Sequence, residues 1–138
     1  MKKMQIGFSP CPNDTFIFDA LIHEKIDTEG IRFEAFMADV EELNQKAFRG
    51  DLSITKLSYH AFFHVMDSYV MMDSGSALGN NCGPLLIKTR GESDPLPDDL
   101  IAIPGKYTTA NFLLNFAYPD LQNKKEMLFS DIESALKR

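Results

Sequence analysis

The order of the predicted strands and helices constrains the fold of this 138-residue sequence more than any other feature. Residues 4–8 are typical of a strand, residues 16–21 carry apolar side chains at helical spacing, and residues 31–36 are typical of a second strand. The same alternation continues to the end of the sequence. Alternating strands and helices are typical of α/β proteins, in which helices connect parallel strands. We therefore predict an α/β fold.

Capping patterns mark the ends of several predicted helices. Asp39 with Glu42 three residues later is a capping-box pattern, and Gly50 suits the position just after a helix. Ser130 with Glu133 is a second capping-box pattern. The predicted strands lie at residues 4–8, 31–36, 52–55, 69–72, 84–88, 100–103 and 126–129, and the predicted helices at about 13–24, 40–49, 58–66, 108–116 and from 130.

A polar run rich in proline, aspartate and glycine, residues 90–99, is the clearest linker. We therefore divide the chain into a first α/β lobe at residues 1–90, a linker at 91–99 and the start of a second α/β lobe at 100–138. The last predicted helix reaches the final residue after about two turns, a length at which an isolated helix is marginal. We expect the chain to be truncated within its second lobe, and we expect self-association as one way to cover the incomplete lobe.

Composition and charge argue against several classes of protein. The sequence carries 14 lysine and arginine residues against 20 aspartate and glutamate residues, which gives a formal net charge of −6. This balance argues against binding to nucleic acid or to an anionic membrane through overall charge. No apolar stretch approaches the ~20 residues of a membrane-spanning helix, and no export signal is recognisable. The two cysteines fit a reducing compartment, so we expect a cytoplasmic protein.

Ligand binding is expected at three junctions between a strand and the following helix, because α/β proteins bind ligands beyond the carboxyl ends of their strands. These junctions are residues 9–15, 55–59 and 104–110. The last two combine a lysine with hydroxyl side chains at a helix start, where unpaired backbone N–H groups attract a carboxylate or phosphate. The alternative is that the hydroxyl groups only cap helices, as Asn13 or Asp14 is expected to cap the first one, and that the two lysines are solvated.

Other residues with catalytic or metal-binding capacity lack the partners that such chemistry requires. His60 and His64 have the i, i+4 spacing of metal ligands, but no glutamate stands between them and no cysteine–histidine cluster supplies further ligands. Cys11 has no histidine nearby in the sequence, which argues against a cysteine nucleophile. The glycine-rich run 75–83 matches neither a phosphate-binding loop nor a dinucleotide fingerprint and is predicted to be a connection. We therefore expect no metal site.

Five motifs follow one another along the chain: GFSPCPNDTF at residues 7–16, DVEELN at 39–44, TKLSY at 55–59, SGSALG at 74–79 and PGKYTTA at 104–110. Together they resemble the motifs of the 1,4-dihydroxy-6-naphthoate synthase family, which belongs to the futalosine route to menaquinone. The resemblance runs through the whole chain in order. The run SPCPNDT is the most specific part of it.

The resemblance implies a periplasmic-binding-protein-like fold of type II, with two lobes, in a cytoplasmic enzyme. The family converts cyclic dehypoxanthinylfutalosine, a small-molecule carboxylate, to 1,4-dihydroxy-6-naphthoate in a lyase-type reaction without a metal or organic cofactor. Its substrate-binding stretches match Lys56, Leu57 and Ser58 in the first lobe and Thr109 and Ala110 in the second. Further positions that would line the cleft are Asn13, Asp14, Thr15, Ser76 and Thr108.

The histidine regarded as the proton acceptor of the family lies in the second lobe, beyond Arg138. His23, His60 and His64 do not occupy that motif. The resemblance therefore implies that the chain carries much of the substrate-binding site but no catalytic residue, and we expect no useful turnover by this half alone. The alternatives are a solute-binding module of the same fold for a small carboxylate, and the related chorismate dehydratase.

Overall fold

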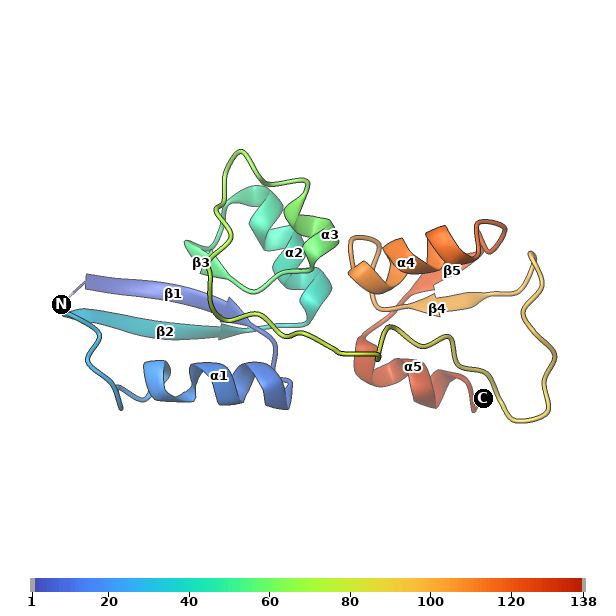
Figure 1. Cartoon of the computed structure of the whole chain (residues 1–138), viewed down its shortest axis with the longest axis horizontal. Coiled ribbons are helices and arrows are strands. Elements are labelled where there is room, and N and C mark those ends of the chain that lie inside the picture. The colour runs from blue at the N-terminus through green and yellow to red at the C-terminus, as the bar shows by residue number, and fades with distance from the viewer. Residues whose placement is uncertain (1, 138) are drawn as a thin grey trace.

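The structure, a computed structural model that describes residues 2–137, contains two parallel β-sheets (Figure 1). In the first sheet, β1 (Lys2–Phe8) lies between β2 (Ile31–Met37) and β3 (Ile54–Thr55). In the second sheet, β4 (Ile101–Ile103) pairs with β5 (Lys124–Glu126). All of these pairs are parallel, so the predicted α/β fold class is confirmed.

Helices cover both faces of each sheet. In the first half, α1 (Pro12–Ile22) lies on one face, and α2 (Val40–Arg49) and α3 (Tyr59–Phe62) lie on the other (Figure 1). In the second half, α4 (Thr109–Ala117) and α5 (Phe129–Ala135) lie on opposite faces. Three of these helices, α1, α2 and α4, return the chain to the edge from which the preceding strand began, so the strands that they connect run parallel. Among residues 2–137, no helix has the length and apolar character needed to cross a bilayer.

The core of the first sheet surrounds the carboxyl-terminal end of β1. Ile6 and Phe8 are buried there, and α2 contributes the buried Leu43 to the same region. Gly7 allows these elements to approach closely, because a Cβ at this position would lie 2.6 Å from Leu52 Cδ1 and 3.0 Å from Leu43 Cδ2. Burial of such side chains contributes roughly 1.5–3 kcal/mol each to folding. The junctions after β1 and β3 are therefore anchored to a packed core.

The second helix begins and ends where the sequence predicts. Asp39 is the N-cap of α2, and its Oδ1 atom accepts a hydrogen bond from the Glu41 N–H at 3.1 Å. Gly50 adopts the left-handed conformation after the helix, with φ of +70°. Glycine reaches this region without the steric cost that a Cβ imposes. Local signals alone were sufficient to place this helix.

The buried face of α1 differs from the predicted one. Phe16 is 84% exposed and Ile17 is also exposed, although both belong to the apolar stripe of residues 16–21. The helix instead turns Asp14 and Phe18 inward, and the Phe18 ring lies 4.9 Å from that of Phe8. Asp14 and Phe18 are four residues apart and therefore share one face. The inward orientation places Asp14 beside the neighbouring junctions, with the contacts described below.

The predicted N-cap of α1, Asn13 or Asp14, is wrong. The helix begins after Cys11, with Pro12 as its first residue. Proline is well suited to this position because its missing N–H would have no partner in the helix. Asp14 consequently lies inside the first turn, where its carboxylate is free to bond to residues outside the helix.

Two predicted strands, residues 69–72 and 84–88, do not form. The described chain has no helix or strand between α3 and β4, a stretch that includes the predicted linker. The apolar side chains of the two predicted strands are largely exposed, with Val70 at 90% and Leu85 at 82%. An apolar run becomes a strand only when a neighbouring strand exchanges hydrogen bonds with it. Neither run pairs with a strand of residues 2–137.

Smaller differences concern the carboxyl-terminal elements and α3. The strand predicted at 126–129 is β5, which ends at Glu126, and Phe129 already belongs to α5. The N-cap of α5 is Leu128, so the capping box predicted at Ser130 and Glu133 is wrong. Ser130 lies within the helix, where its Oγ atom bonds to the neighbouring carboxylate. The helix predicted at 58–66 is also shorter, since α3 ends at Phe62.

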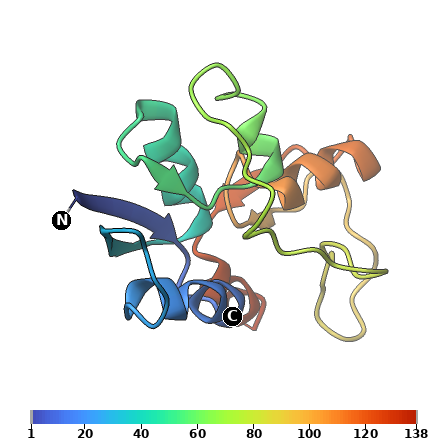
Figure 2. The ribbon, with the colours of Figure 1, turned by 60° about the vertical axis from the view of Figure 1, so that its left-hand side comes forward.

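The strands of the two sheets point toward each other, so their carboxyl ends face the middle of the molecule (Figures 1 and 2). An aromatic cluster of Phe48, His60, His64, Tyr107 and Phe112 joins the two halves there. Tyr107 lies 4.7 Å from Phe48 and 5.4 Å from His64 between ring centroids, and His60 lies 4.9 Å from Phe112. This contact holds α3 beside α4.

Candidate functional site

The three junctions selected from the sequence lie at the carboxyl ends of β1, β3 and β4, on the facing sides of the two sheets (Figure 1). The first two are neighbours because β1 pairs with β3, with Gly7 opposite Thr55. The Lys56 N–H continues this pairing and donates to the Gly7 carbonyl oxygen at 2.7 Å. Residues 9–15 and 55–59 thus form one surface of the first half, and residues 104–110 lie on the facing side of the second.

Lys56 connects the first two junctions through its side chain. Its Nζ atom lies 3.3 Å from Asp14 Oδ1 and donates a hydrogen bond to the Gly75 carbonyl oxygen at 2.8 Å. The Asp14 carboxylate also accepts hydrogen bonds from the Ser9 N–H and hydroxyl, at 3.1 and 2.8 Å. The Asp14 side chain is 8% exposed and that of Lys56 is 22% exposed. An ammonium group has three donors, so Lys56 retains capacity for a ligand.

Replacing Lys56 with methionine should lower the free energy of unfolding by about 1–2 kcal/mol, because the Asp14 carboxylate then stays buried without a cation. The loss is moderate because Ser9 continues to donate two hydrogen bonds to that carboxylate. Urea unfolding monitored by circular dichroism measures the change. Lys125→Met, at an exposed position of β5, is the matched control and should have little effect. Equal stability of the two variants would show that the Asp14–Lys56 pair contributes nothing.

A continuous chain of hydrogen bonds, named here the Ser58–Tyr107 link, joins the second junction to the third. The Ser58 N–H donates to Asn44 Oδ1 at 3.0 Å, and Asn44 Nδ2 donates to Ser58 Oγ at 3.3 Å. The same Nδ2 donates to Glu41 Oε2 at 3.2 Å, and this oxygen also accepts from the Tyr107 N–H at 3.1 Å. The N–H of the N-cap Ser58 is therefore occupied, whereas the N–H groups of Tyr59 and His60, the first residues of α3, have no hydrogen-bond partner within residues 2–137.

The start of α4 retains unpaired backbone N–H groups. Thr108 is the N-cap, and its Oγ1 atom accepts from the Asn111 N–H at 3.3 Å and donates to the Gly105 carbonyl oxygen at 2.7 Å. Within residues 2–137, the N–H groups of Thr109 and Ala110 have no hydrogen-bond partner. A helix N-terminus carries partial positive charge. This part of the candidate site therefore has the chemistry to hold an anion.

The other predicted positions are distributed around the first half of the site. Ser76 is brought there by its Oγ atom, which lies 3.0 Å from the hydroxyl of Tyr59. The Thr15 hydroxyl donates to the Cys11 carbonyl oxygen at 3.1 Å and so serves its own helix. Leu57 is half-buried. The glycine-rich run is thus more than a connection, since its first residues bond to the junction after β3.

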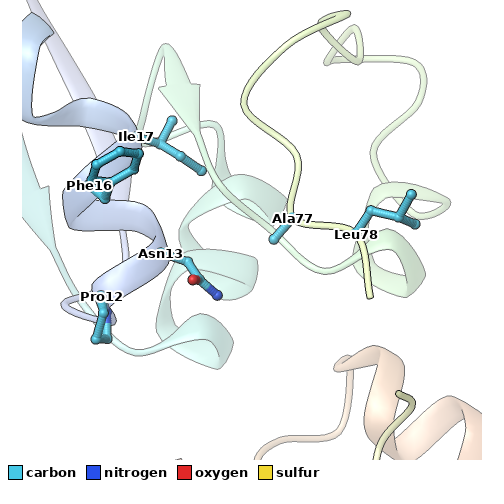
Figure 3. Close-up of a pocket in the computed structure, with 6 residues that line it drawn as sticks. All are labelled: Pro12, Asn13, Phe16, Ile17, Ala77 and Leu78. Carbon is cyan, nitrogen blue, oxygen red and sulfur yellow. The ribbon is translucent and has the colours of Figure 1, made fainter. Parts of the chain in front are cut away.

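An open hollow of about 490 Å³ lies between the first turns of α1 and the glycine-rich run (Figure 3). Its lining residues are Pro12, Asn13, Phe16, Ile17, Ala77 and Leu78. Among its lining residues, Asn13 is a predicted site residue, and Ala77 directly follows another one, Ser76. The lining includes none of residues 56–58 or 109–110. The hollow therefore adjoins the candidate site without containing the two segments that define it.

The carboxylates with a displaced pKa are found elsewhere. A hydrogen bond from Lys25 lowers the pKa of Asp19, and one from Lys3 lowers the pKa of Glu34. These are exposed ion pairs of α1 and the first sheet. Among residues 2–137, no group of three or more histidine, cysteine, aspartate or glutamate side chains is placed to hold a metal ion.

Three residues of the site, Asn44, Glu41 and Tyr107, lie within the motifs of the sequence but are not among the predicted site residues. A signal existed for Asn44, because it follows Leu43 on the side of α2 that also buries Ala47. A polar side chain on a buried helix face must find hydrogen-bond partners. No comparable signal existed for Tyr107, whose contribution is its backbone N–H.

Parallel strands whose carboxyl ends meet at polar loops define this chain as an α/β protein, a class that binds its ligands beyond the carboxyl ends of the strands. A sequence model of the family described as menaquinone biosynthesis matches residues 4–138. The chain belongs to this family.

Two curated relatives are named 1,4-dihydroxy-6-naphthoate synthase. The Thermus thermophilus protein is 48% identical over 115 residues, which cover 83% of this chain and 42% of the relative. The Streptomyces coelicolor protein is 38% identical over 110 residues, which cover 80% of this chain and 38% of the relative. A crystal structure of an Archaeoglobus fulgidus protein matches with a TM-score of 0.89 and 35% identity, over 97% of this chain and 49% of that chain. The chain thus spans about two fifths of the length of these curated relatives.

Proposed function

We propose that the chain holds the substrate in the reaction of 1,4-dihydroxy-6-naphthoate synthase, the conversion of cyclic dehypoxanthinylfutalosine to 1,4-dihydroxy-6-naphthoate. The observation that carries the proposal is the Ser58–Tyr107 link, which ties together the two segments that match the family's substrate-binding stretches. Because hydrogen bonds join these two segments across the two sheets, they support one shared substrate site better than either segment would alone. The names of both curated relatives support the same activity.

In this proposal, the two segments have different roles. The unpaired N–H groups of Thr109 and Ala110 receive the substrate carboxylate, and the Lys56 ammonium adds positive charge from the opposite side. Fixed donors of this kind orient the substrate and stabilise charge that develops during the reaction. We assign no proton transfer to His60 or His64, because both are packed in the aromatic cluster.

We further propose that the two sheets are parts of the two lobes of a periplasmic-binding-protein-like fold of type II. Residues 1–90 would contribute to the first lobe, 91–99 to a linker and 100–138 to the second lobe. The facing carboxyl ends of the strands support this division, since such a fold holds its ligand between lobes. The lack of helix or strand from 91 to 99 is also consistent with a linker.

Calorimetric titration of the chain with 1,4-dihydroxy-6-naphthoate under anaerobic conditions tests the proposal. We expect binding, and we expect 1,4-dihydroxynaphthalene, which lacks the carboxylate, to bind at least about tenfold more weakly. Thr109→Pro removes the N–H of the first residue of α4, a position at which proline fits a helix, and should weaken binding about three- to tenfold. Phe129→Pro, at the corresponding first position of α5, is the control and should bind like the unmodified chain.

Failure of the unmodified chain to bind the naphthoate would contradict the proposal. Equal affinity for the naphthoate and for the compound without a carboxylate would contradict the anion-binding role of α4. Comparable binding of unrelated small carboxylates would instead favour a solute-binding module.

A further inference from the structure

The Glu41 carboxylate brings together three hydrogen-bond donors from two parts of the fold. Its Oε2 atom accepts from the Tyr107 N–H at 3.1 Å and from Asn44 Nδ2 at 3.2 Å, and its Oε1 atom accepts from Gln45 Nε2 at 3.0 Å. Among residues 2–137, no lysine, arginine or histidine forms an ion pair with Glu41. Its bonds are all to neutral N–H groups. They therefore depend on where its oxygen atoms lie more than on its charge.

The loop before α4 is fitted closely to Glu41. Gly105 is buried, and a Cβ at this position would lie 2.4 Å from Glu41 Oε2 and 2.6 Å from Glu41 Cβ. The loop is in turn fixed to α4, because Asn111 Nδ2 donates to the Lys106 carbonyl oxygen at 2.8 Å. A displacement of the Glu41 side chain would thus be transmitted to the first turn of α4.

Tyr107 contacts α2 through its ring and through its backbone N–H, and the two contacts differ in how strictly they require one geometry. Its ring lies 4.7 Å from that of Phe48, a largely apolar contact that tolerates sliding. Its N–H bonds to Glu41, and a hydrogen bond weakens steeply when its length or angle changes. Both contacts hold the two halves together, and the hydrogen bond to Glu41 is the one more sensitive to how the halves align.

We infer that Glu41 is a positioning residue for the proposed substrate site. Through Asn44 it fixes Ser58, and through the Tyr107 N–H it fixes the first turn of α4. A single side chain thereby sets the separation between the two segments that hold the ligand. This inference rests on the proposed function, since alignment of the segments matters only if both contact one substrate.

Three substitutions of Glu41 separate the effect of its side-chain length from the effect of its negative charge. Glu41→Gln keeps the length of the side chain and one acceptor oxygen but removes the charge. Glu41→Asp keeps the charge but shortens the side chain, and Glu41→Ala removes both. Glu42→Ala, at the exposed next position of α2, is the matched control. Amide hydrogen exchange at Tyr107, measured by NMR, reports the hydrogen bond, and titration with 1,4-dihydroxy-6-naphthoate reports the site.

We expect Glu41→Asp and Glu41→Ala to speed exchange at Tyr107 by about tenfold or more and to weaken naphthoate binding about fivefold or more. Glu41→Gln and Glu42→Ala should stay within about threefold of the unmodified chain in both measurements. A residue that acted only through its charge at the helix start would give the reverse order, with Glu41→Asp close to normal and Glu41→Gln impaired.

The outcomes distinguish this inference from the proposed function. If the unmodified chain binds the naphthoate and all variants bind it equally well, positioning by Glu41 is wrong and the proposed function stands. Unchanged exchange at Tyr107 in Glu41→Ala would also overturn the inference. If the unmodified chain does not bind the naphthoate, the proposed function fails and the positioning role fails with it.

Discussion

Replacing Asn44 with alanine should lower the free energy of unfolding by about 2–4 kcal/mol, because it removes a buried side chain whose amide bonds to half-buried groups of Ser58 and Glu41. Asn44 is fully buried, and its amide bonds to the Ser58 N–H, the Ser58 hydroxyl and Glu41 Oε2. A loss of this size is a large fraction of the roughly 5–15 kcal/mol that stabilises an ordinary domain. Equilibrium urea unfolding monitored by circular dichroism measures it.

A second variant separates hydrogen bonding from packing. Asn44→Asp preserves the shape of the side chain and the acceptor for the Ser58 N–H, but it removes the donors and places a second carboxylate beside Glu41. It should therefore destabilise the protein at neutral pH although it leaves no cavity. Asn115→Ala, at an exposed position of α4, is the control and should change stability by less than about 1 kcal/mol. Similar effects of Asn44→Ala and Asn115→Ala would contradict a structural role for the Asn44 amide.

Replacing Gly105 with alanine should destabilise the protein and push the loop before α4 away from Glu41. The added methyl group would lie 2.6 Å or less from three atoms of Glu41, and φ at this residue is +148°, where side chains are strained. We expect a cost of about 1–3 kcal/mol from overpacking and about 1–3 kcal/mol from the backbone. The Tyr107 amide should exchange faster with solvent, because its acceptor on Glu41 is displaced.

Gly91→Ala provides a matched control for the backbone contribution. Gly91 also has a positive φ, +93°, but nothing lies within 4 Å of the position of its missing Cβ. Unfolding in urea should therefore reveal a smaller loss for Gly91→Ala than for Gly105→Ala, with no change in exchange at Tyr107. Equal losses would mean that the close approach of Glu41 to Gly105 costs nothing to disturb.

Elements defined by local signals could be predicted from the sequence, whereas elements that need a distant partner could not. The cap at Asp39 and the glycine at Gly50 are local, and α2 was placed correctly. The run at residues 84–88 has the composition of a strand, but it pairs with nothing in the described chain. Likewise, the inward face of α1 contacts residues far along the chain, since Asp14 pairs with Lys56.

The candidate site was predicted in outline but not in its internal connections. The junctions after β1, β3 and β4 were selected by a general property of α/β folds, and they occupy facing ends of the two sheets. Which groups remain free for a ligand depends on contacts between segments. Asn44 takes the N–H of Ser58 and Glu41 takes that of Tyr107, whereas the N–H groups of Thr109 and Ala110 have no partner among residues 2–137. Residue types alone do not distinguish the occupied N–H groups from the free ones.

The long, largely exposed stretch between α3 and β4 should be open to cleavage by a protease. It is the single connection between the two sheets, and a protease would find accessible peptide bonds there. A nick in this stretch would leave two polypeptides, each with its own sheet, whose contacts include the aromatic cluster and the bond from Tyr107 to Glu41. Copurification of the two pieces after cleavage would show that the two halves bind each other without a covalent connection.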